Sequence, residues 1–394
     1  MRWLPPENKL GPQQREFIKK LDDFLHKPDS ALRNVWINGF AGSGKSILLV
    51  YSVHKILSFS SNSRILVVVF THSLVEMFKA ALKEIGLNVP VVTYFEFMKD
   101  NNHYDYILCD EVQDLTHRVI HAMMVRASHV IVAGDSNQSI FDTDPYWHES
   151  TVESSEIGYL INGDAFELGI IYRLSRSIID AVQRFLPRMN IFSSKRDMSK
   201  SDTQIRLCEA SSEAEEVSYI IEQATKSVNQ GYSTVILIPT HRKIISFINQ
   251  ALIEAGKNPW IEQRNRFSKI DFDAMNKYMQ SNGLKMQYVG NGYGHFSDDN
   301  RKVIIMTFHS SKGLDFDDVF IPFVNSSMFI CSNESLAKTL FMVAMTRTRS
   351  NLYITYHGYP SDYLDTFKSN CSRIDISAST KVTTTIDGDN PWGF

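Results

Sequence analysis

Short apolar runs alternate with amphipathic stretches along most of the chain. In the first half, the apolar runs are Asn34–Asn38, Arg64–Phe70, Tyr104–Cys109 and Val130–Ala133. Runs of this length without strict polar alternation are typical of strands that are buried on both faces of a parallel sheet. Between them, Leu74–Ile85 places apolar residues at helical spacing. The alternation predicts an α/β fold in which helices cover both faces of a parallel sheet.

The second half of the chain repeats this pattern. The predicted strands are Gln204–Cys208, Val235–Ile238, Val303–Thr307 and Val319–Ile321, and the predicted helices are Glu213–Ser227, Arg242–Ala255 and Leu336–Thr346. We therefore expect two α/β domains, residues 1–165 and 166–370, joined near Gly163–Arg173. The polar segment Arg264–Asn300 is compatible with a loop, a small insertion or a mobile flap. Residues 371–394 are expected to form a polar tail, either a loose end or an acidic-aromatic peptide that docks on a partner.

Composition and charge narrow the protein class only slightly. Hydrophobic residues make up 43% and charged residues 22%, near the averages for globular proteins. No apolar run approaches the roughly 18 residues of a membrane span, and no signal peptide is recognisable at the N-terminus, so we expect a cytoplasmic protein without a membrane partner. The net charge of −3 does not indicate a nucleic-acid partner. It does not exclude one, because a single-strand groove needs only local positive charge and stacking surfaces.

A glycine-rich segment, Gly39–Ser46, reads GFAGSGKS and fits the phosphate-binding pattern GxxxxGK[ST]. It lies between a predicted strand and the apolar helical stretch Ile47–Ile56, which is the context that the pattern requires. Glycines allow close backbone approach, and successive N–H groups at a helix N-terminus face phosphate charge. We therefore predict ATP as the ligand, with Lys45 on the β- and γ-phosphates and Ser46 on Mg²⁺. The other predicted nucleotide-binding residues of this segment are Gly39, Gly42, Ser43 and Gly44.

Two adjacent carboxylates, Asp110 and Glu111, follow the predicted strand Tyr104–Cys109. The carboxyl end of a parallel strand is where ligand sites of α/β proteins form. Asp110 is placed to hold Mg²⁺, and Glu111 is placed to orient and deprotonate an attacking water. A further strand ends at Gly134–Gln138, which is either a polar turn or a second group of side chains beside the phosphates.

Several segments together resemble the UvrD/Rep-type superfamily 1 helicases, in the order in which that family carries its motifs. The matching segments are Gln14–Glu16, Phe70–Ser73, Asp110–Asp114, Gly134–Phe141, Tyr172–Arg173, Thr307–Phe316 and Val343–Arg347. The last two match the family patterns TxHxxKGLEF and VAxTRA. The resemblance implies two RecA-like domains that bind a nucleotide and a nucleic-acid strand.

The resemblance also implies roles for individual residues. Gln14 would bond the adenine edge, and Tyr172 would stack on its face. Gln138 would sense the γ-phosphate, while Arg173 and Arg347 would supply positive charge to the transferring phosphoryl group. Asp315 is assigned to nucleotide binding. The nucleic-acid track is assigned to Phe70, Thr71, Thr93, Phe141, Thr307, His309 and Lys312.

The chain departs from the family pattern in three respects. Larger members of the family carry big insertions at two places, which correspond here to the short segments 94–109 and Arg264–Asn300. Because this chain has no room for those insertions, strong unwinding of duplexes by the chain alone is in doubt. The base-stacking tryptophan of the family falls at Thr143, where Tyr146 or Trp147 is a possible substitute. Asp315 replaces a glutamate of the family, which keeps the charge and shortens its reach.

We therefore expect an ATP-dependent DNA helicase or translocase that moves on single-stranded DNA, by resemblance in the 3′→5′ direction. The alternative is an ATP-dependent switch or clamp that works with a nuclease or repair partner and unwinds little alone. RNA stays open as the track, because no residue reads a 2′-hydroxyl recognisably.

Overall fold

The computed structural model describes residues 4–27, 34–135, 144, 147–187, 195–196, 202–296 and 302–377. The chain divides into two compact units. The first unit comprises Arg2–Leu174 and Ile191–Lys200, and the second comprises Ser175–Asn190 and Ser201–Phe394. Each unit is described by itself.

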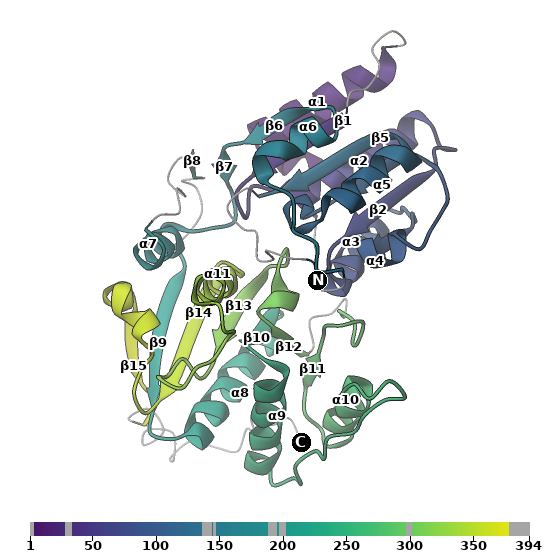
Figure 1. Ribbon diagram of the computed structural model, residues 1–394. Helices are drawn as coiled ribbons and strands as arrows, with labels where there is room; N and C mark the ends of the chain where they lie inside the picture. The colour runs from purple at the N-terminus through teal and green to yellow at the C-terminus, as the bar shows by residue number, and fades with distance from the viewer. Residues whose placement is uncertain are drawn as a thin grey trace. The chain divides into compact units, whose positions relative to one another are not determined.

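The first unit contains, within its described residues, a six-stranded sheet in which every pairing is parallel (Figure 1). The strands in sheet order are β3 (Val91–Thr93), β2 (Ile65–Val69), β4 (Tyr104–Cys109), β5 (Ala127–Gly134), β1 (Asn34–Gly39) and β6 (Gly163–Leu168). The helices are α1 (Pro12–His26), α2 (Lys45–Phe59), α3 (His72–Glu84), α4 (Tyr94–Phe97), α5 (His117–Arg126) and α6 (Ile157–Leu160), with short 3-10 turns at Glu7–Lys9, Val112–Asp114 and Ser154–Glu156. A short parallel pair, β7 (Ile170–Ile171) and β8 (Lys195–Arg196), completes the described elements of this unit.

Alternate residues of β2 enter the two layers of core that lie on opposite faces of this sheet. Leu66 and Val68 pack in a cluster with residues of α4, α5 and α6. Val67 and Val69 are equally buried and point the other way, toward the face covered by α2 and α3. Burial on both faces explains why the strands read as continuous apolar runs, as we predicted.

The second unit contains a seven-stranded sheet, again with parallel pairings throughout the residues described. The strands in sheet order are β11 (Met286–Tyr288), β12 (Val303–Thr307), β10 (Thr234–Ile238), β13 (Phe316–Ile321), β14 (Thr348–His357), β9 (Gln204–Ala210) and β15 (Ser372–Asp375). The helices are α7 (Arg176–Phe185), α8 (Glu213–Asn229), α9 (His241–Glu254), α10 (Phe272–Ser281) and α11 (Glu334–Met345), with 3-10 turns at His309–Ser311, Asp362–Thr366 and Lys368–Asn370.

Helices again cover both faces of the second sheet. Val303 and Ile305 of β12 join a cluster with residues of α8, α9 and α10, and Figure 1 shows α8 and α9 side by side. Ile304 and Met306, also buried, point to the opposite face, where α11 contacts β13 and α7. The two parallel sheets flanked by helices confirm the predicted α/β, RecA-like fold class.

Three details differ from the expected organisation. The junction between the units follows Leu174 rather than residue 165, because Gly163–Leu168 pairs with β1 and so belongs to the first sheet. Ser372–Asp375, expected as the start of a tail, forms β15 at the edge of the second sheet, because its backbone pairs with β9. Residues 378–394 lie outside the described part of the chain. Within Arg264–Asn300, the described residues form α10 and β11, secondary structure that the open alternatives of a loop, a small insertion or a mobile flap did not specify.

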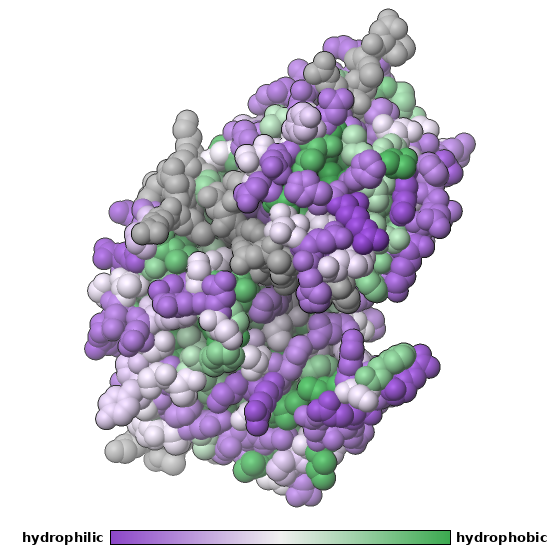
Figure 2. Space-filling model, viewed as in Figure 1, coloured by the Kyte–Doolittle hydropathy of each residue, from purple (hydrophilic) through white to green (hydrophobic). Residues whose placement is uncertain are grey.

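The surface in the view of Figure 2 is largely hydrophilic, with small hydrophobic patches. Among the described residues, no helix combines the length and apolar character needed to cross a membrane.

Candidate functional site

The phosphate-binding loop connects β1 to α2. Gly42 and Gly44 have φ of 81° and 92°, a left-handed conformation that favours glycine. A Cβ on Gly44 would lie 2.0 Å from Nε2 of Gln14, so the loop also lacks space for a side chain there. The loop therefore depends on glycine for its backbone angles and for its packing. Its geometry places the backbone of residues 42–46 around the N-terminus of α2.

Three predicted nucleotide-binding residues from elsewhere in the first unit surround this loop. Gln14 is buried, and its Nε2 donates to the Ser43 carbonyl oxygen at 2.8 Å. The backbone N–H groups of Tyr172 and Arg173 both donate to the Gly42 carbonyl oxygen, at 2.9 and 3.1 Å. These contacts join segments that lie far apart in sequence at one end of β1.

The loop has the features of a phosphate cradle. Lys45 is buried, and its Nζ donates to the carbonyl oxygens of Gly39 and Phe40, at 2.7 and 3.2 Å. The Ser43 hydroxyl is fully buried and has no hydrogen-bond partner within the part of the chain that is described. A buried hydroxyl without an acceptor is unfavourable, and a phosphate oxygen would supply one. The residues of this loop therefore fit a nucleotide.

Ser46 and Asp110 meet beside the loop. The Ser46 hydroxyl donates to Oδ2 of Asp110 at 2.5 Å. Burial and the neighbouring Glu111 carboxylate raise the pKa of Asp110 to about 6, while the Ser46 hydrogen bond and the Lys45 charge act in the opposite direction. Oxygen ligands of this kind suit Mg²⁺, which takes few protein ligands and completes its shell with phosphate and water. Consistent with a small donor set, the described residues contain no cluster of three or more His, Cys, Asp or Glu side chains that could hold a metal alone.

Glu111 is held in an unusual conformation beside Asp110. Its φ of 56° is left-handed, which is uncommon for a residue other than glycine and is often found at functional sites. The Gln113 side chain donates to Oε2 of Glu111 at 2.5 Å and accepts from the Asp135 N–H at 3.1 Å. Gln113 thus links two predicted motifs. Sequence reasoning gave it no role, although its spacing from Glu111 was a signal.

Two predicted residues, Gln138 and Phe141, lie outside the described residues, as do Thr143 and Tyr146. Trp147, the other proposed substitute for the stacking tryptophan, is half-buried. Its ring centroid lies 5.9 Å from that of Tyr94 and 6.0 Å from that of Phe95, and the Arg118 guanidinium lies over it at 5.2 Å.

The predicted track residues of the first unit have local structural partners. The Phe70 ring stacks on Tyr94, with centroids 4.9 Å apart. Thr71 caps α3 by accepting from the Leu74 N–H, and Thr93 caps α4 by accepting from the Glu96 N–H. Phe70 and Thr93 are largely buried. These contacts explain the residue types at helix starts, and contact with nucleic acid stays a prediction.

In the second unit, the segment from Thr307 to Lys312 forms a compact turn after β12. The Thr307 hydroxyl donates to the Ser310 hydroxyl at 2.9 Å and accepts from the Ser310 N–H at 3.1 Å. Burial, with the nearby His241 and Lys312, lowers the pKa of His309. Lys312 is almost fully buried.

Arg347 is also almost fully buried, with 1% of its surface exposed. Its guanidinium donates to the carbonyl oxygens of Val343 and Leu314 and to the Thr346 hydroxyl, at 2.9 to 3.0 Å. Asp315 accepts from Arg349 at 2.7 Å. Arg349 also lies 3.5 Å from Asp317, and sequence reasoning missed it because a lone arginine carries no motif signal.

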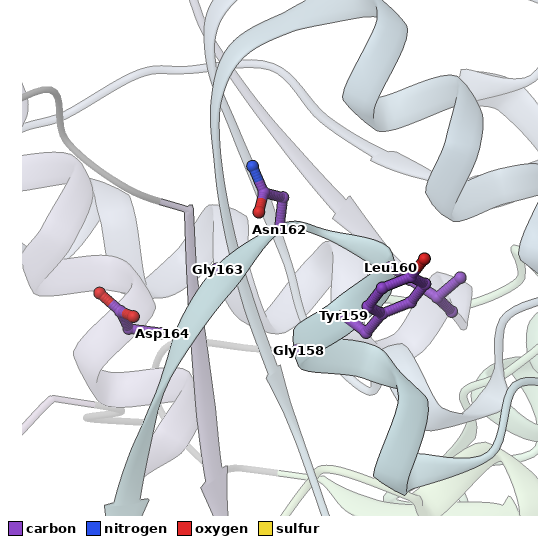
Figure 3. Close-up of a pocket in the computed structure, with 6 residues that line it drawn as sticks. All are labelled: Gly158, Tyr159, Leu160, Asn162, Gly163 and Asp164. Atoms are coloured by element: carbon purple, nitrogen blue, oxygen red, sulfur yellow. The ribbon is translucent and has the colours of Figure 1, made fainter.

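A shallow cavity of about 590 Å³ lies at the other end of the first sheet (Figure 3). It is lined by Gly158, Tyr159, Leu160, Asn162, Gly163 and Asp164. Gly163 pairs with Asn34 at the start of β1, whereas the phosphate loop follows Gly39 at its end. In Figure 3, Tyr159 and Asp164 lie on opposite sides of the β6 ribbon rather than converging. This cavity is therefore separate from the nucleotide-binding residues.

Comparisons with known proteins agree with these motifs. Residues 265–359 match the family described as UvrD-like helicase C-terminal domain, and residues 27–143 match an AAA domain family. A probable DNA helicase II homolog of Mycoplasma capricolum subsp. capricolum is 28% identical over 145 residues, which cover 34% of this chain and 19% of that protein. The chain thus spans less than a fifth of that relative's length.

Several solved helicase structures are similar at low identity. The structure of PRRSV helicase has a TM-score of 0.43 and 15% identity, and the match covers 86% of this chain and 54% of that one. An arterivirus nonstructural protein 10 (helicase), solved in complex with DNA, has a TM-score of 0.41 and 14% identity, with 90% and 65% covered.

The two family matches and the Mycoplasma relative agree with the motifs quoted from the sequence. Both matched ranges include residues that the structure places at or directly after the ends of parallel strands, among them Asp110 and Thr307, and the first range also includes Lys45 at the start of α2. These matches therefore support the resemblance of the chain to the UvrD/Rep-like superfamily 1 helicases.

Proposed function

We propose that this chain hydrolyses ATP and uses the reaction to move along single-stranded DNA in the 3′→5′ direction. The observation that carries the proposal is the meeting of Lys45, the Ser46–Asp110 pair and Glu111 at the end of β1 and β4. Those groups are the ones that phosphoryl transfer to water needs: a cation for the phosphates, oxygen ligands for a metal and a base.

Each group has a distinct part in the proposed reaction. Glu111 orients a water and takes its proton as the water oxygen attacks the γ-phosphorus. The bond from that phosphorus to the bridging oxygen breaks, and ADP leaves. Lys45 stabilises the negative charge on the phosphates. Mg²⁺, which Ser46 and Asp110 would hold, neutralises charge on the phosphate oxygens when bound.

The remaining nucleotide contacts are proposed from the family motifs. Gln14 reads the adenine edge, and Tyr172 stacks on the ring. Gln138 senses the γ-phosphate, and Arg173 and Arg347 stabilise its charge. Because Arg347 donates to three acceptors of its own unit, this role requires its guanidinium to exchange at least one of them for a phosphate oxygen. Asp315, paired with Arg349, contributes to the nucleotide site only indirectly in this arrangement.

The strand is proposed to follow the carboxyl ends of both sheets. In the first unit it meets Phe70, Thr71, Thr93 and Phe141, and in the second it meets Thr307, His309 and Lys312. DNA is favoured over RNA because the Mycoplasma relative is named a DNA helicase.

A second candidate function is an ATP-dependent clamp that serves a nuclease or repair partner. The observation that favours it is the short connection between Thr93 and Asp110, where α4 has only four residues. An element of that size offers little surface for contact with a duplex.

The test is ATP turnover by the purified full chain with single-stranded DNA, duplex DNA and RNA of equal length. We expect strong stimulation by single-stranded DNA and loss of turnover in Lys45→Ala. Release of streptavidin from biotin at either strand end then reports the direction of movement. If no nucleic acid changes the rate of ATP turnover, the proposal of an ATP-driven motor is overturned. If single-stranded DNA stimulates turnover but no strand is displaced, the proposal of an ATP-dependent clamp is favoured.

A further inference from the structure

A tight hairpin over residues 263–271 connects α9 to α10 in the second unit. Its two sides are joined at Arg264 and Ile270, and by a bond from the Asn265 N–H to the Lys269 carbonyl oxygen at 2.8 Å. The Asp271 N–H closes the base by donating to the Gln263 carbonyl oxygen at 2.8 Å. Figure 1 shows the connection beside α10 extending away from the strands of this unit.

The tip of this 263–271 hairpin is held in one conformation by side chains. Oδ1 of Asn265 accepts from the N–H groups of Phe267 and Lys269, at 2.9 and 3.2 Å. Arg264 donates to the Ser268 carbonyl oxygen at 2.8 Å. Ser268 has a φ of 59°, a left-handed value that is unfavourable for serine. The turn therefore accepts a local conformational cost while its outer residues bury little surface.

The tip presents an aromatic ring among positive charges. Phe267 is 66% exposed, and the Arg266 guanidinium lies 4.7 Å from its ring centroid. Lys269 is exposed beside them, whereas Arg264 pairs with the Glu262 carboxylate at 2.7 Å and Asp271 lies at the base of the hairpin. A single exposed apolar residue is ordinary. An exposed aromatic ring beside the cations Arg266 and Lys269 is instead a combination that proteins use to bind a nucleic-acid strand.

The hairpin is connected through packed groups to the turn that follows β12. Nδ2 of Asn265 donates to the Tyr293 hydroxyl at 2.8 Å, and the Tyr293 ring packs against Phe272. Phe272 stacks on Tyr288, with centroids 4.1 Å apart. A Cβ on Gly290 would lie 2.8 Å from the Tyr288 hydroxyl and 3.0 Å from the Ser310 hydroxyl. These groups connect the hairpin to Gly290, whose position is beside the Ser310 hydroxyl in the segment from Thr307 to Lys312.

We propose that the 263–271 hairpin binds single-stranded nucleic acid, with Phe267 stacking on a base and Arg266 and Lys269 contacting neighbouring phosphates. The proposal rests on the proposed function, because the strand is the one that the motor follows. It adds a contact that no recognised motif contains. Stacking on an aromatic ring accepts any base, so the contact carries no sequence preference.

The test measures binding of fluorescent oligo-dT and oligo-rU to the full chain by anisotropy over a range of salt concentrations. Phe267→Ala weakens binding about fivefold or more, and Phe267→Trp retains it, because a larger ring also stacks. Arg266→Ala and Lys269→Ala each reduce the slope of log affinity against log salt by about one. Phe329→Ala, an equally exposed ring of the same unit, and Lys226→Ala on α8 leave binding unchanged.

The outcomes separate this inference from the proposed function. Equal affinities for wild type, Phe267→Ala and Phe329→Ala, with strand-stimulated ATP turnover in the wild type, would overturn the hairpin contact alone. A wild type that binds strands through Phe267 but turns over no ATP would overturn the motor alone. A wild type that binds neither oligonucleotide would overturn both. Thermal unfolding midpoints confirm that each variant is folded before its affinity is compared.

Discussion

The two units hold their motif residues in different ways. In the first unit the motif side chains contact one another: Ser46 donates to Asp110, and Gln113 donates to Glu111. In the second unit, Arg347 instead contacts its own scaffold. Arg347 donates to the Val343 and Leu314 carbonyl oxygens and is almost fully buried.

Because of this difference, substitutions of the two kinds of residue are expected to have different effects on ATP turnover and on folding stability. A small cluster of side chains around a glycine loop can lose one member without disturbing the core, because the loop conformation comes from its glycines and from β1 and α2. A buried guanidinium that donates to backbone carbonyls is part of the core itself, and its removal takes a donor away from each of them. Substitution of Glu111 is therefore expected to change turnover, and substitution of Arg347 to change folding as well.

The largest expected effect is on turnover in Glu111→Gln. Removal of a general base typically lowers the rate by about 10²–10⁴-fold. ATP affinity stays near that of wild type, because Lys45 and the loop are untouched. Steady-state turnover and titration with a fluorescent ATP analogue measure the two quantities. The matched control is Glu153→Gln, an exposed carboxylate of the same unit; a rate equal to that of this control would remove the role assigned to Glu111.

Arg347→Ala is expected to destabilise the protein by about 3 kcal/mol, because it opens a cavity and leaves buried acceptors unpaired. Urea unfolding of the full chain measures this change. Glu111→Gln serves as the comparison and is expected to shift the unfolding midpoint far less. If the two variants unfold at the same urea concentration, the contrast between the units does not hold.

Thr71→Ala removes the cap of α3 and is expected to cost about 1 kcal/mol of stability. Ser212, which caps α8 by accepting from the Glu215 N–H at 3.2 Å, gives a matched variant in the second unit. Both substitutions lower stability by a similar amount, whereas only Thr71→Ala weakens binding of single-stranded DNA. Equal DNA affinities for the two variants would leave Thr71 with its capping role alone.

The smallest expected effect concerns pH. The buried Glu216 carboxylate accepts from His357 at 2.5 Å, and this hydrogen bond raises the pKa of His357. A raised folded-state pKa stabilises the fold fully below the unfolded value of about 6.5, and this stabilisation is lost as pH rises through the folded value. Unfolding midpoints compared at about pH 6 and about pH 9 should therefore fall more in wild type than in His357→Gln. A larger fall in the variant would contradict this sign.

The sequence predicted some elements of the fold better than others. The apolar runs that become β2, β10 and β12 are buried at every position, and β4 is buried over its second half, so their pattern is unambiguous. The strand β14 was missed, although it lies between β13 and β9, because its buried residues are interrupted by polar ones such as Asn351. The predicted boundary after residue 165 falls inside Gly163–Leu168, because only Leu168 of this strand is buried and the strand joins the sheet through its backbone.

The sequence by itself determined the glycine loop, the order of the motifs and the two-sheet architecture, because these depend on local backbone requirements and on short-range periodicity. Only the tertiary structure decided which side chains meet. Gln113 bridges Glu111 and Asp135, and Arg347 lies in the core of its unit, because pairing between distant strands sets those distances. Hydrogen bonds across a sheet edge leave no periodic signal in the chain, so the pattern of apolar and polar residues did not locate them.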